Sequence, residues 1–348
     1  MTAPLEAPPK PGMVWVPGGT FSMGSELDGY PEEGPVHSVS VDGFWMDACP
    51  VTVAEFRTFV LDTGYATVAS RPLDPAAYPG VDPKMLVPGS LVFQKARQAL
   101  DLKAALKQPT LPWWKYIPGA DWRHPEGPGS HVGGRAEHPV VHVAWEDVCA
   151  YAEWAGKAIP TEAEWEFAAR GGIDGAIFTW GNDPNPDNQV MANTWQGEFP
   201  WQNLMVDGYE RTSPVSSFPA NGYGLFDMAG NVWEWTSDYF APSHDTAGVD
   251  DHPCCTPLNP RVQSPDNSYD LSDGRAARIP RRVIKGGSHL CAPNYCLRYR
   301  PAARQPQMED SSMSHIGFRC IVRPGDVGNR TTHQNDQEVR NGVHGNDR

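Results

Sequence analysis

The segment NGYGLFDMAGNVWEWTSD, residues 221–238, carries the pattern on which the fold assignment depends. Asp227 and Glu234 bracket Gly230 and Val232 within it, so that carboxylates alternate with backbone carbonyls along a loop. Oxygen atoms in this order suit a hard cation such as Ca²⁺, although the spacing is not that of an EF-hand. The alternative is an aromatic core turn, in which the tryptophans pack and Glu234 accepts hydrogen bonds from backbone amides. The spacing leaves both interpretations open.

Three helices with clear end signals or amphipathic spacing are predicted before this segment. Thr52 followed by Glu55, and Thr161 followed by Glu164, have the spacing of a capping box, which satisfies the first turn of a helix. The two helices run through EFRTFVLDTG and TEAEWEFAARGG, and each ends at glycine. Between them, EDVCAYAEWAG, residues 146–156, has the apolar spacing of an amphipathic helix.

The predicted strands are short. Residues 13–25, MVWVPGGTFSMGS, have the pattern of a strand, a turn and a strand, and residues 37–44 alternate like another strand. HPVVHVAW, residues 138–145, is predicted to be a buried strand. Residues 70–136 are rich in Pro and Gly and predict a long elaborated loop with one helix near 93–106.

These elements predict an α+β protein with little regular secondary structure. The 34 Gly and 35 Pro residues interrupt helices and strands, and 13 Trp residues supply large side chains to pack the irregular backbone. We expect one domain over residues 13–323. Residues 1–12 are expected to be an unstructured leader, and the polar residues 324–348 a disordered tail.

Composition excludes several classes of function. The net charge of −14 repels phosphate backbones, so nucleic acid is not an expected partner. The chain has no run of 18 apolar residues that would span a membrane. The first residues, MTAPLEAPPKPG, lack the basic and apolar regions of a signal peptide, so a cytoplasmic location is expected.

The seven cysteines are few and odd in number, which argues against a secreted disulfide framework. Most are expected to be buried thiols, including the adjacent Cys254 and Cys255. Cys291 and Cys296 differ because they are five residues apart in KGGSHLCAPNYCLRYRPAAR, residues 285–304, with Pro293 between them. Across a turn this spacing lets two sulfur atoms converge.

Two thiolates without a convincing third protein ligand suit Cu(I), a soft ion that accepts low coordination. Zinc prefers four ligands, and His289 alone does not complete such a set. Arg298, Arg300 and Arg304 are expected to favour the ionised thiolates. A disulfide and a pair of unrelated buried thiols remain the alternatives, because the C-x4-C spacing alone is not specific.

A second set of oxygen ligands lies in ANTWQGEFPWQNLMVDGY, residues 192–209. Asn193 and Asp207 offer side-chain oxygens, and Thr194 and Tyr209 offer backbone carbonyls. A solvated polar loop explains the same residues. The sequence lacks the zinc-protease, P-loop and dinucleotide-binding motifs, and Ser288 in GGSHL is not in the context of a hydrolase nucleophile.

Taken together, these segments resemble the formylglycine-generating enzyme family, also called the sulfatase-modifying factor family. The resemblance covers residues 13–322 and includes VPGGTFSMGS, HPVVHVAW, GKAIPTEAEWEFAARGG, NTWQGEFP, GNVWEW, the cysteine segment and HIGFRC. The GNVWEW and PTEAEWE blocks are common to a broader superfamily. The paired cysteines after GGS are more specific to formylglycine generators.

The resemblance implies a variant of the C-type-lectin-like fold. It also implies an activity: the aerobic oxidation, with O₂, of the cysteine in a C-x-P-x-R motif of an unfolded type I sulfatase, giving formylglycine. The implied cofactor is Cu(I), held at the positions of Cys291 and Cys296. A monomer that binds neither nucleic acid nor a membrane is expected.

The family also implies roles for other residues. Ser288 and Trp233 match positions that line the oxygen and substrate pocket, and Tyr295 lies beside the copper loop. Two structural Ca²⁺ sites are implied, and their ligands are residues already singled out: Asn193, Thr194, Asp207 and Tyr209 for the first site, and Asp227, Gly230, Val232 and Glu234 for the second.

The chain departs from the family pattern at two places. Ala292-Pro293-Asn294 replaces a polar segment that begins with His in many relatives, and His315 replaces an Asn common in the substrate groove. Both changes leave the copper ligands intact and bear on client preference.

Two other functions compete with this interpretation. An iron-dependent sulfoxide synthase of the same superfamily would need an iron-binding His cluster, which the sequence lacks. A non-catalytic lectin-like binding module would need neither Cys291 nor Cys296.

Overall fold

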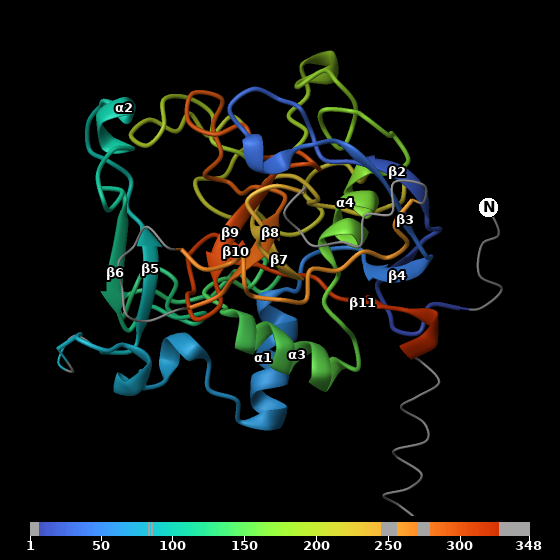
Figure 1. The fold of residues 1–348 in the computed structure, drawn as a ribbon. Coiled ribbons are helices and arrows are strands. Elements are labelled where there is room, and N and C mark those ends of the chain that lie inside the picture. The colour runs from blue at the N-terminus through green and yellow to red at the C-terminus, as the bar shows by residue number, and fades with distance from the viewer. Residues whose placement is uncertain (1–6, 83, 85, 245–255, 271–278, 327–348) are drawn as a thin grey trace, which may run out of the picture.

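The computed structural model describes residues 7–82, 84, 86–244, 256–270 and 279–326 (Figure 1). The strands are β1 (Met13–Val16), β2 (Gly19–Met23), β3 (His37–Val41), β4 (Phe44–Asp47), β5 (Gly89–Phe93), β6 (Trp114–Pro118), β7 (Trp233–Tyr239), β8 (Arg281–Lys285), β9 (Arg304–Met308), β10 (Ile316–Gly317) and β11 (Ile321–Val322). The helices are α1 (Val53–Thr63), α2 (Leu102–Ala105), α3 (Trp145–Ala155) and α4 (Glu162–Arg170). The α+β prediction with little regular structure is confirmed.

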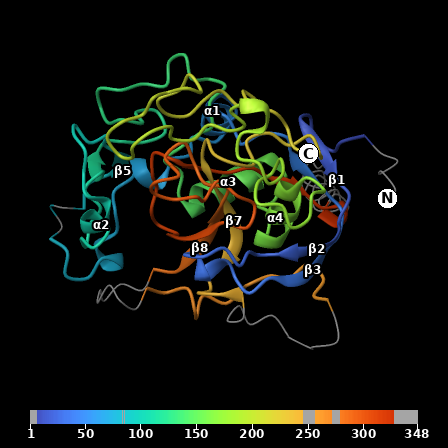
Figure 2. The same ribbon diagram turned by 90° about the horizontal axis from the view of Figure 1, so that it is seen from above.

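The strands form four small sheets. The central sheet has the order β10-β7-β8-β9, with β10 parallel to β7 and the other pairs antiparallel. A second sheet has the order β1-β4-β11, and β2-β3 and β5-β6 are two-stranded. Figure 2 shows the β2-β3 pair and the β5 region on different sides of the body, with long loops between them. Segments far apart in sequence therefore meet around the central sheet.

The capping boxes are confirmed. The Thr52 hydroxyl accepts from the backbone N–H of Glu55, and the Thr161 hydroxyl accepts from that of Glu164. The helices α1, α3 and α4 end at Gly64, Gly156 and Gly171, each in the left-handed conformation. Side-chain caps and terminal glycines are local devices, so the sequence alone locates these helices well.

Strands β1 and β2 form as predicted around a glycine turn, but they do not pair with each other. β1 pairs with β4, and β2 pairs with β3. Gly18 has φ +69°, and a Cβ atom at this position would lie 2.5 Å from the backbone nitrogen of Gly43. The turn is thus pressed against the β3–β4 connection, which directs the two strands into different sheets.

Two predicted elements are wrong. Residues 138–145 are not a strand, because His142 has φ +61° and interrupts the extended backbone. The segment is nevertheless buried, and its backbone bonds separately to Val51 and Met313. Residues 93–106 are not one helix: Phe93 ends β5, and only α2 is helical, capped by the carboxylate of Asp101.

Several predictions fall on residues that the structure does not describe. Cys254 and Cys255 lie outside the described residues, as do residues 1–6 of the expected leader and 327–348 of the expected tail. No helix within the described ranges has the length and apolar character needed to cross a bilayer.

The interior contains a fully buried ion pair. The guanidinium of Arg319 donates to both carboxylate oxygens of Glu234 at 2.7 and 2.8 Å, and the indole N–H of Trp165 donates to one of them at 2.7 Å. Arg319 also donates to the carbonyls of Asp47, Ala48 and Phe226. Neither charge contacts water, so each depends on the other for compensation.

We predict that Arg319→Met lowers the free energy of unfolding by about 3–5 kcal/mol, because it leaves the Glu234 carboxylate buried without a counter-charge. Urea denaturation followed by fluorescence measures this. The matched control is Arg71→Met, which breaks the ion pair with Glu146 at the surface, where the side chains are 40% and 56% exposed. The control is expected to cost about 0–1 kcal/mol. Equal losses in the two variants would contradict the proposed importance of the buried pair.

Candidate active site

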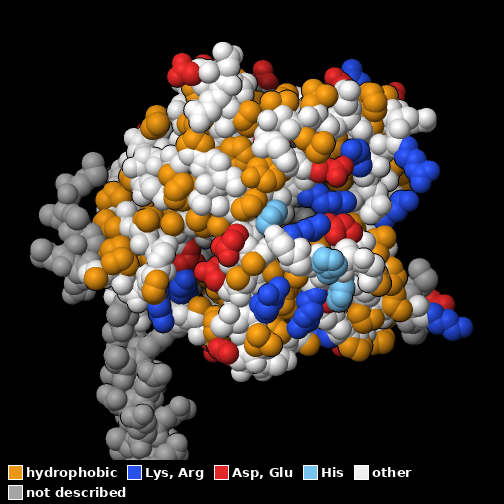
Figure 3. Space-filling view, turned by 180° about the vertical axis from the view of Figure 1, so that it is seen from behind, with side chains coloured by type: hydrophobic (Ala, Val, Ile, Leu, Met, Phe, Trp, Pro, Cys, Tyr) orange, Lys and Arg blue, Asp and Glu red, His pale blue; other side chains and the backbone are white. Residues whose placement is uncertain are grey.

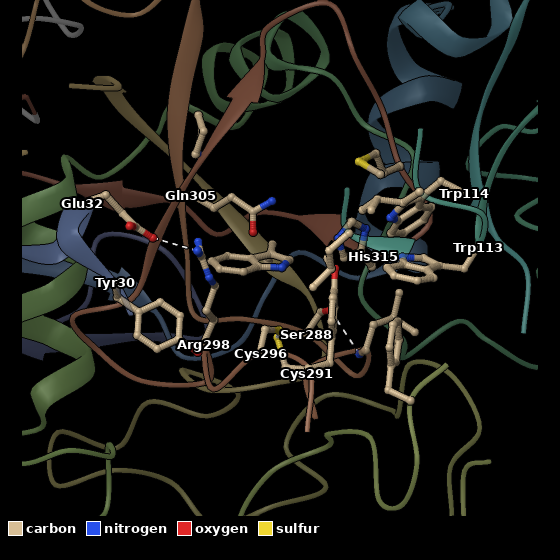
Figure 4. Close-up of a pocket in the computed structure, with 18 of the residues that line it drawn as sticks. Tyr30, Glu32, Trp113, Trp114, Ser288, Cys291, Cys296, Arg298, Gln305 and His315 are labelled. Atoms are coloured by element: carbon tan, nitrogen blue, oxygen red, sulfur yellow. Dashed lines mark hydrogen bonds and ion pairs between the residues drawn. The ribbon is translucent and has the colours of Figure 1, made fainter. Parts of the chain in front are cut away.

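A cleft with a volume of about 710 Å³ lies beside the central sheet. Its floor contains Ser288, Cys291 and Cys296 (Figure 4). One wall carries Tyr30, Glu32 and Arg298, and the opposite wall carries Trp113, Trp114 and His315. Figure 3 shows one face of the molecule, where Lys, Arg and His side chains border a hollow.

Two glycines allow the floor to form. Gly286 has φ +90° and Gly287 has φ +70°, which L-amino acids with side chains rarely adopt. A Cβ atom on Gly287 would lie 2.8 Å from the carbonyl oxygen of Arg298, and one on Gly286 would lie 3.0 Å from the Trp165 ring. The two residues that follow β8 therefore have to be glycines, because a side chain at Gly286 would press on the Trp165 ring and one at Gly287 would press on the backbone of Arg298.

The two cysteines converge across a helical turn, as the spacing allowed. The N–H of Cys296 donates to the carbonyl of Ala292 at 2.8 Å, and the N–H of Cys291 donates to that of Ser288 at 2.9 Å. The Sγ atoms of Cys291 and Cys296 lie 3.1 Å apart, and both residues are free thiols rather than a disulfide. Cys291 is buried and Cys296 is half-buried.

The thiols have opposite electrostatic environments. Burial raises the pKa of Cys291, but the hydrogen bond from Cys296, the backbone and the nearby Arg298 outweigh it, so that its pKa lies below the usual value. Donating that hydrogen bond, together with burial, raises the pKa of Cys296 well above the usual value. The first proton is therefore lost from Cys291.

The arginines after the cysteines do not act together. Arg298 lines the cleft and pairs with Glu32 at 2.7 Å. Arg300 instead forms a buried bidentate pair with Glu33, and Arg304 forms one with Glu162. Of the three arginines expected to favour thiolates, Arg298 has this position, and the other two stabilise the surrounding loops.

Ser288 and Trp233 both lie in the cleft, where the family resemblance placed them. Ser288 is fully buried, and its hydroxyl accepts from the N–H of Leu290 at 3.2 Å. Trp233 is the first residue of β7, and its N–H donates to the carbonyl of His315 at 2.9 Å. The pairing of β10 with β7 therefore places His315, which directly precedes β10, next to Trp233.

Tyr295 belongs to an aromatic cluster behind the cysteine turn. Its ring stacks on Phe199 with centroids 4.2 Å apart, and it meets Trp113 edge to face at 5.4 Å. Phe93 and Trp195 complete the cluster. These rings fix the position of the turn that presents the two sulfur atoms.

The side chain of His315 is buried, and one of its ring nitrogens finds no hydrogen-bond partner among the described residues. Its ring lies against Trp114, with centroids 4.7 Å apart, and lines the cleft. The Nδ1 atom is buried and has no hydrogen-bond partner. Burial lowers the pKa of His315 well below the usual value, so the ring is neutral. An unsatisfied buried nitrogen is rare, because it costs free energy without return.

Two residues of the first expected calcium set, Thr194 and Asp207, have oxygen atoms that converge. The side-chain amide of Gln196 donates to the Thr194 carbonyl and to the Asp207 carboxylate, so these two oxygens face one small group. Asp207 also accepts from the N–H of Tyr209. The amide nitrogen of Asn193 donates to the carbonyl of Arg211, a bond that does not use the side-chain oxygen expected as a ligand. Thr194 and Asp207 thus fit a cation that would take the place of the Gln196 amide.

The second expected calcium set fits less well. The Asp227 carboxylate accepts from the N–H of Ser216 and the side chain of Asn231, while Gly230 and Val232 lie between it and β7. Both oxygens of Glu234 accept from Arg319 and Trp165. A cation bound by Glu234 would have to share this carboxylate with a guanidinium.

Sequence reasoning missed most of the cleft wall. Tyr30, Glu32, Trp113 and Trp114 come from loops far from the cysteines in sequence, and only the adjacent tryptophans gave any signal of a packed surface. Within the described residues, no group of three or more His, Cys, Asp or Glu side chains is arranged to hold a metal.

Comparison with known proteins gives a consistent result. Residues 2–324 match the model of the sulfatase-modifying factor enzyme 1-like domain. A formylglycine-generating enzyme of Mycobacterium tuberculosis is 50% identical, covering 90% of this chain and 98% of that protein. An inactive C-alpha-formylglycine-generating enzyme 2 of Mus musculus is 38% identical, and the match covers 90% of this chain and 87% of that protein. The structure of PvdO from Pseudomonas aeruginosa has a TM-score of 0.56 and 25% sequence identity, and the match covers 89% of this chain and 93% of that one. The expected fold class is thereby confirmed.

We predict that His315→Leu changes the free energy of unfolding by no more than about 1 kcal/mol, because the ring nitrogen that it removes has no partner to lose. The matched variant is His142→Leu. That buried ring bonds Ser90 at 2.7 Å and the Pro125 carbonyl at 2.9 Å, and losing it is expected to cost about 1–3 kcal/mol. Chemical denaturation compares the two. A large loss in His315→Leu would show that this ring is structural.

Proposed function

The chain belongs to the sulfatase-modifying factor enzyme 1-like family, and from this premise we propose that it is a copper-dependent formylglycine-generating oxidase. Its substrate is the cysteine of a C-x-P-x-R motif in an unfolded type I sulfatase, and O₂ is the acceptor. The observation that carries the proposal is the pair of free thiols whose sulfur atoms lie 3.1 Å apart on the floor of an open cleft.

Family membership alone does not establish activity, because a 38% identical relative is named inactive. The proposal therefore rests on the cleft. A binding module has no chemical need for two converging thiols, and an iron enzyme needs a His cluster that the described residues do not form. Two sulfur donors without a third side-chain ligand favour a soft, low-coordinate ion over zinc.

Cys291 and Cys296 would hold Cu(I), which when bound supplies the one-electron chemistry that O₂ activation requires. No third side chain among the described residues completes the set, and both cysteines line the cleft, so the client's own thiol could approach the pair there. The Arg298 guanidinium favours the anionic state of Cys291. Trp233 and Ser288 form the adjoining surface, and the rings around Tyr295 exclude water from behind the turn.

We also propose that Ca²⁺ stabilises the loop that contains Asp207 and Tyr209. The support is the convergence of the Thr194 carbonyl and the Asp207 carboxylate on one amide.

A cytoplasmic location is proposed as well, since the five described cysteines are free thiols, as expected in a reducing compartment.

We predict that the purified protein, loaded with Cu(I) and exposed to air, converts a C-x-P-x-R peptide to the aldehyde. Mass spectrometry follows the loss of mass that separates a thiol from an aldehyde. Cys291→Ala and Cys296→Ala are expected to abolish conversion and tight copper binding, because each removes half of the donor set.

The matched control is Cys149→Ala, which removes a half-buried thiol from α3 and is expected to retain full conversion. Conversion that persists in both cleft variants would refute the assignment of the copper ligands. If the parent protein neither binds copper nor converts the peptide, the result would favour the non-catalytic binding module over the oxidase.

We predict that Ca²⁺ raises the melting temperature relative to EDTA-treated protein, with a stabilisation of about 2.7 kcal/mol at 100 times the dissociation constant. Asp207→Asn is expected to lose most of this shift, because it removes the only carboxylate of the first set. Asp183→Asn is the control: within the described part of the chain, its side chain accepts from the nearby N–H of Asn185, which an amide oxygen also permits. Equal shifts in the two variants would place calcium elsewhere.

A further inference from the structure

The helix α2 forms part of the cleft rim. Its turn continues past Ala105, since the N–H of Lys107 donates to the carbonyl of Ala104. Leu106 lines the cleft, although half of its surface is exposed. Residues three and four apart lie on the same face of a helical turn. Lys103 is three residues from Leu106 and four from Lys107, so both bases lie on the helical turn that supplies the rim residue Leu106.

These two lysines are available to a partner. Both are exposed, and neither forms an ion pair with any residue that the structure describes. The only nearby carboxylate in the sequence, Asp101, caps the start of α2 by accepting from the N–H of Ala104 at 3.1 Å. Lys95, by contrast, is already paired with Glu210 at 3.0 Å.

The positive charge of this segment is unusual for the chain. Residues 94–118 contain five basic residues and one acidic residue, whereas the whole chain has a net charge of −14. The segment also supplies Leu111, Trp113 and Trp114 to the cleft. A basic rim on an acidic protein attracts anions to the place where the rim lies, at distances up to about 10 Å at 0.1 M salt.

The far end of the cleft has the opposite character. Glu32 lies there, opposite Trp113 and Trp114 (Figure 4), and is paired with Arg298, while Asp28, four residues earlier in the chain, also lines the cleft. In a C-x-P-x-R motif the arginine follows the reactive cysteine by four residues. The lysines on α2 repel this arginine, and the Asp28 end does not. An extended client therefore has its residues before the cysteine directed toward α2.

We propose that Lys103 and Lys107 form a docking rim for acidic side chains of the client polypeptide, on the N-terminal side of its reactive cysteine. The inference rests on the proposed function, because it takes the client to be a C-x-P-x-R polypeptide. It assigns the rim to client selection and orientation. The lysines do not touch the reacting atoms.

The test measures binding separately from catalysis. Three labelled peptides carry the motif with serine in place of the reactive cysteine: one has two aspartates before the serine, one has them after the arginine, and one is neutral. Fluorescence anisotropy with the full chain at low and high salt gives their affinities. The upstream-acidic peptide is expected to bind roughly fivefold more tightly than the others at low salt, and this preference is expected to disappear at high salt.

The variant Lys103→Glu/Lys107→Glu is expected to abolish the preference. The matched control is Lys115→Glu, which reverses an exposed charge of the same basic segment. Lys115 is exposed on β6 and is not among the residues that line the cleft. The control is expected to retain the preference, and its unfolding midpoint checks the fold.

A parallel assay with the cysteine-containing peptides is expected to show the same selectivity in KM with kcat unchanged. Equal affinities for the three peptides, a preference for the downstream-acidic peptide, or an equal effect of Lys115→Glu would overturn the proposal. If the peptides bind with the expected preference but are not converted by the copper-loaded protein, the failure lies in the proposed oxidase activity. The two conclusions are thereby separable.

Discussion

The ion pair between Arg319 and Glu234 is the constraint on which the site depends. The guanidinium bonds the carbonyls that follow β4 and the carbonyl of Phe226, and the carboxylate bonds the indole of Trp165 on α4. One buried cation therefore joins four segments of the chain. Glu234 is the neighbour of Trp233 in β7, so the same pair fixes the strand that forms part of the cleft floor.

A second buried network holds the other side of the site. Lys285, the last residue of β8, bonds Glu166 at 3.0 Å and lies 3.5 Å from Glu162. Arg304 pairs with Glu162, and Arg300 pairs with Glu33. The turn that contains the two cysteines lies between Lys285 and Arg300 in the chain, so a buried ion pair fixes the backbone on each side of it. In a protein with four short α-helices in its described part, buried and mutually compensated charges provide the rigidity that longer elements would supply elsewhere.

The sequence predicted what local interactions determine. The helices could be located because threonine caps and terminal glycines are read within a few residues, and the convergence of Cys291 and Cys296 needed only a turn. The strand predicted over residues 138–145 failed because the left-handed backbone at His142 is imposed by its buried partners, Ser90 and Pro125. A hydrophobic pattern contains no information about such a tertiary constraint.

Glu234 shows the same limit at the candidate site. Its place in a loop pattern of oxygens suggests a cation, and the cation that the fold brings to it is Arg319, 85 residues away. The wall of the cleft is likewise assembled from residues near 30, 113 and 315, which no spacing rule connects. Packing partners at long range decide both cases, whereas the expected roles of Ser288 and Trp233 came from the family resemblance.

The departures from ordinary packing identify the cleft as the functional region. Gly286 and Gly287 adopt left-handed conformations against backbone, His315 carries an unpartnered buried nitrogen, and two thiols with opposite pKa shifts lie in contact. The glycines directly precede Ser288, and Ser288, His315 and the two thiols line the same cavity. By contrast, His142 also has a left-handed backbone, but both of its ring nitrogens form hydrogen bonds, with Ser90 and with the Pro125 carbonyl. Buried nitrogens elsewhere in the described residues, such as that of Trp122, also lack a partner, so what distinguishes His315 is its place: its ring lines the cleft that contains the two thiols.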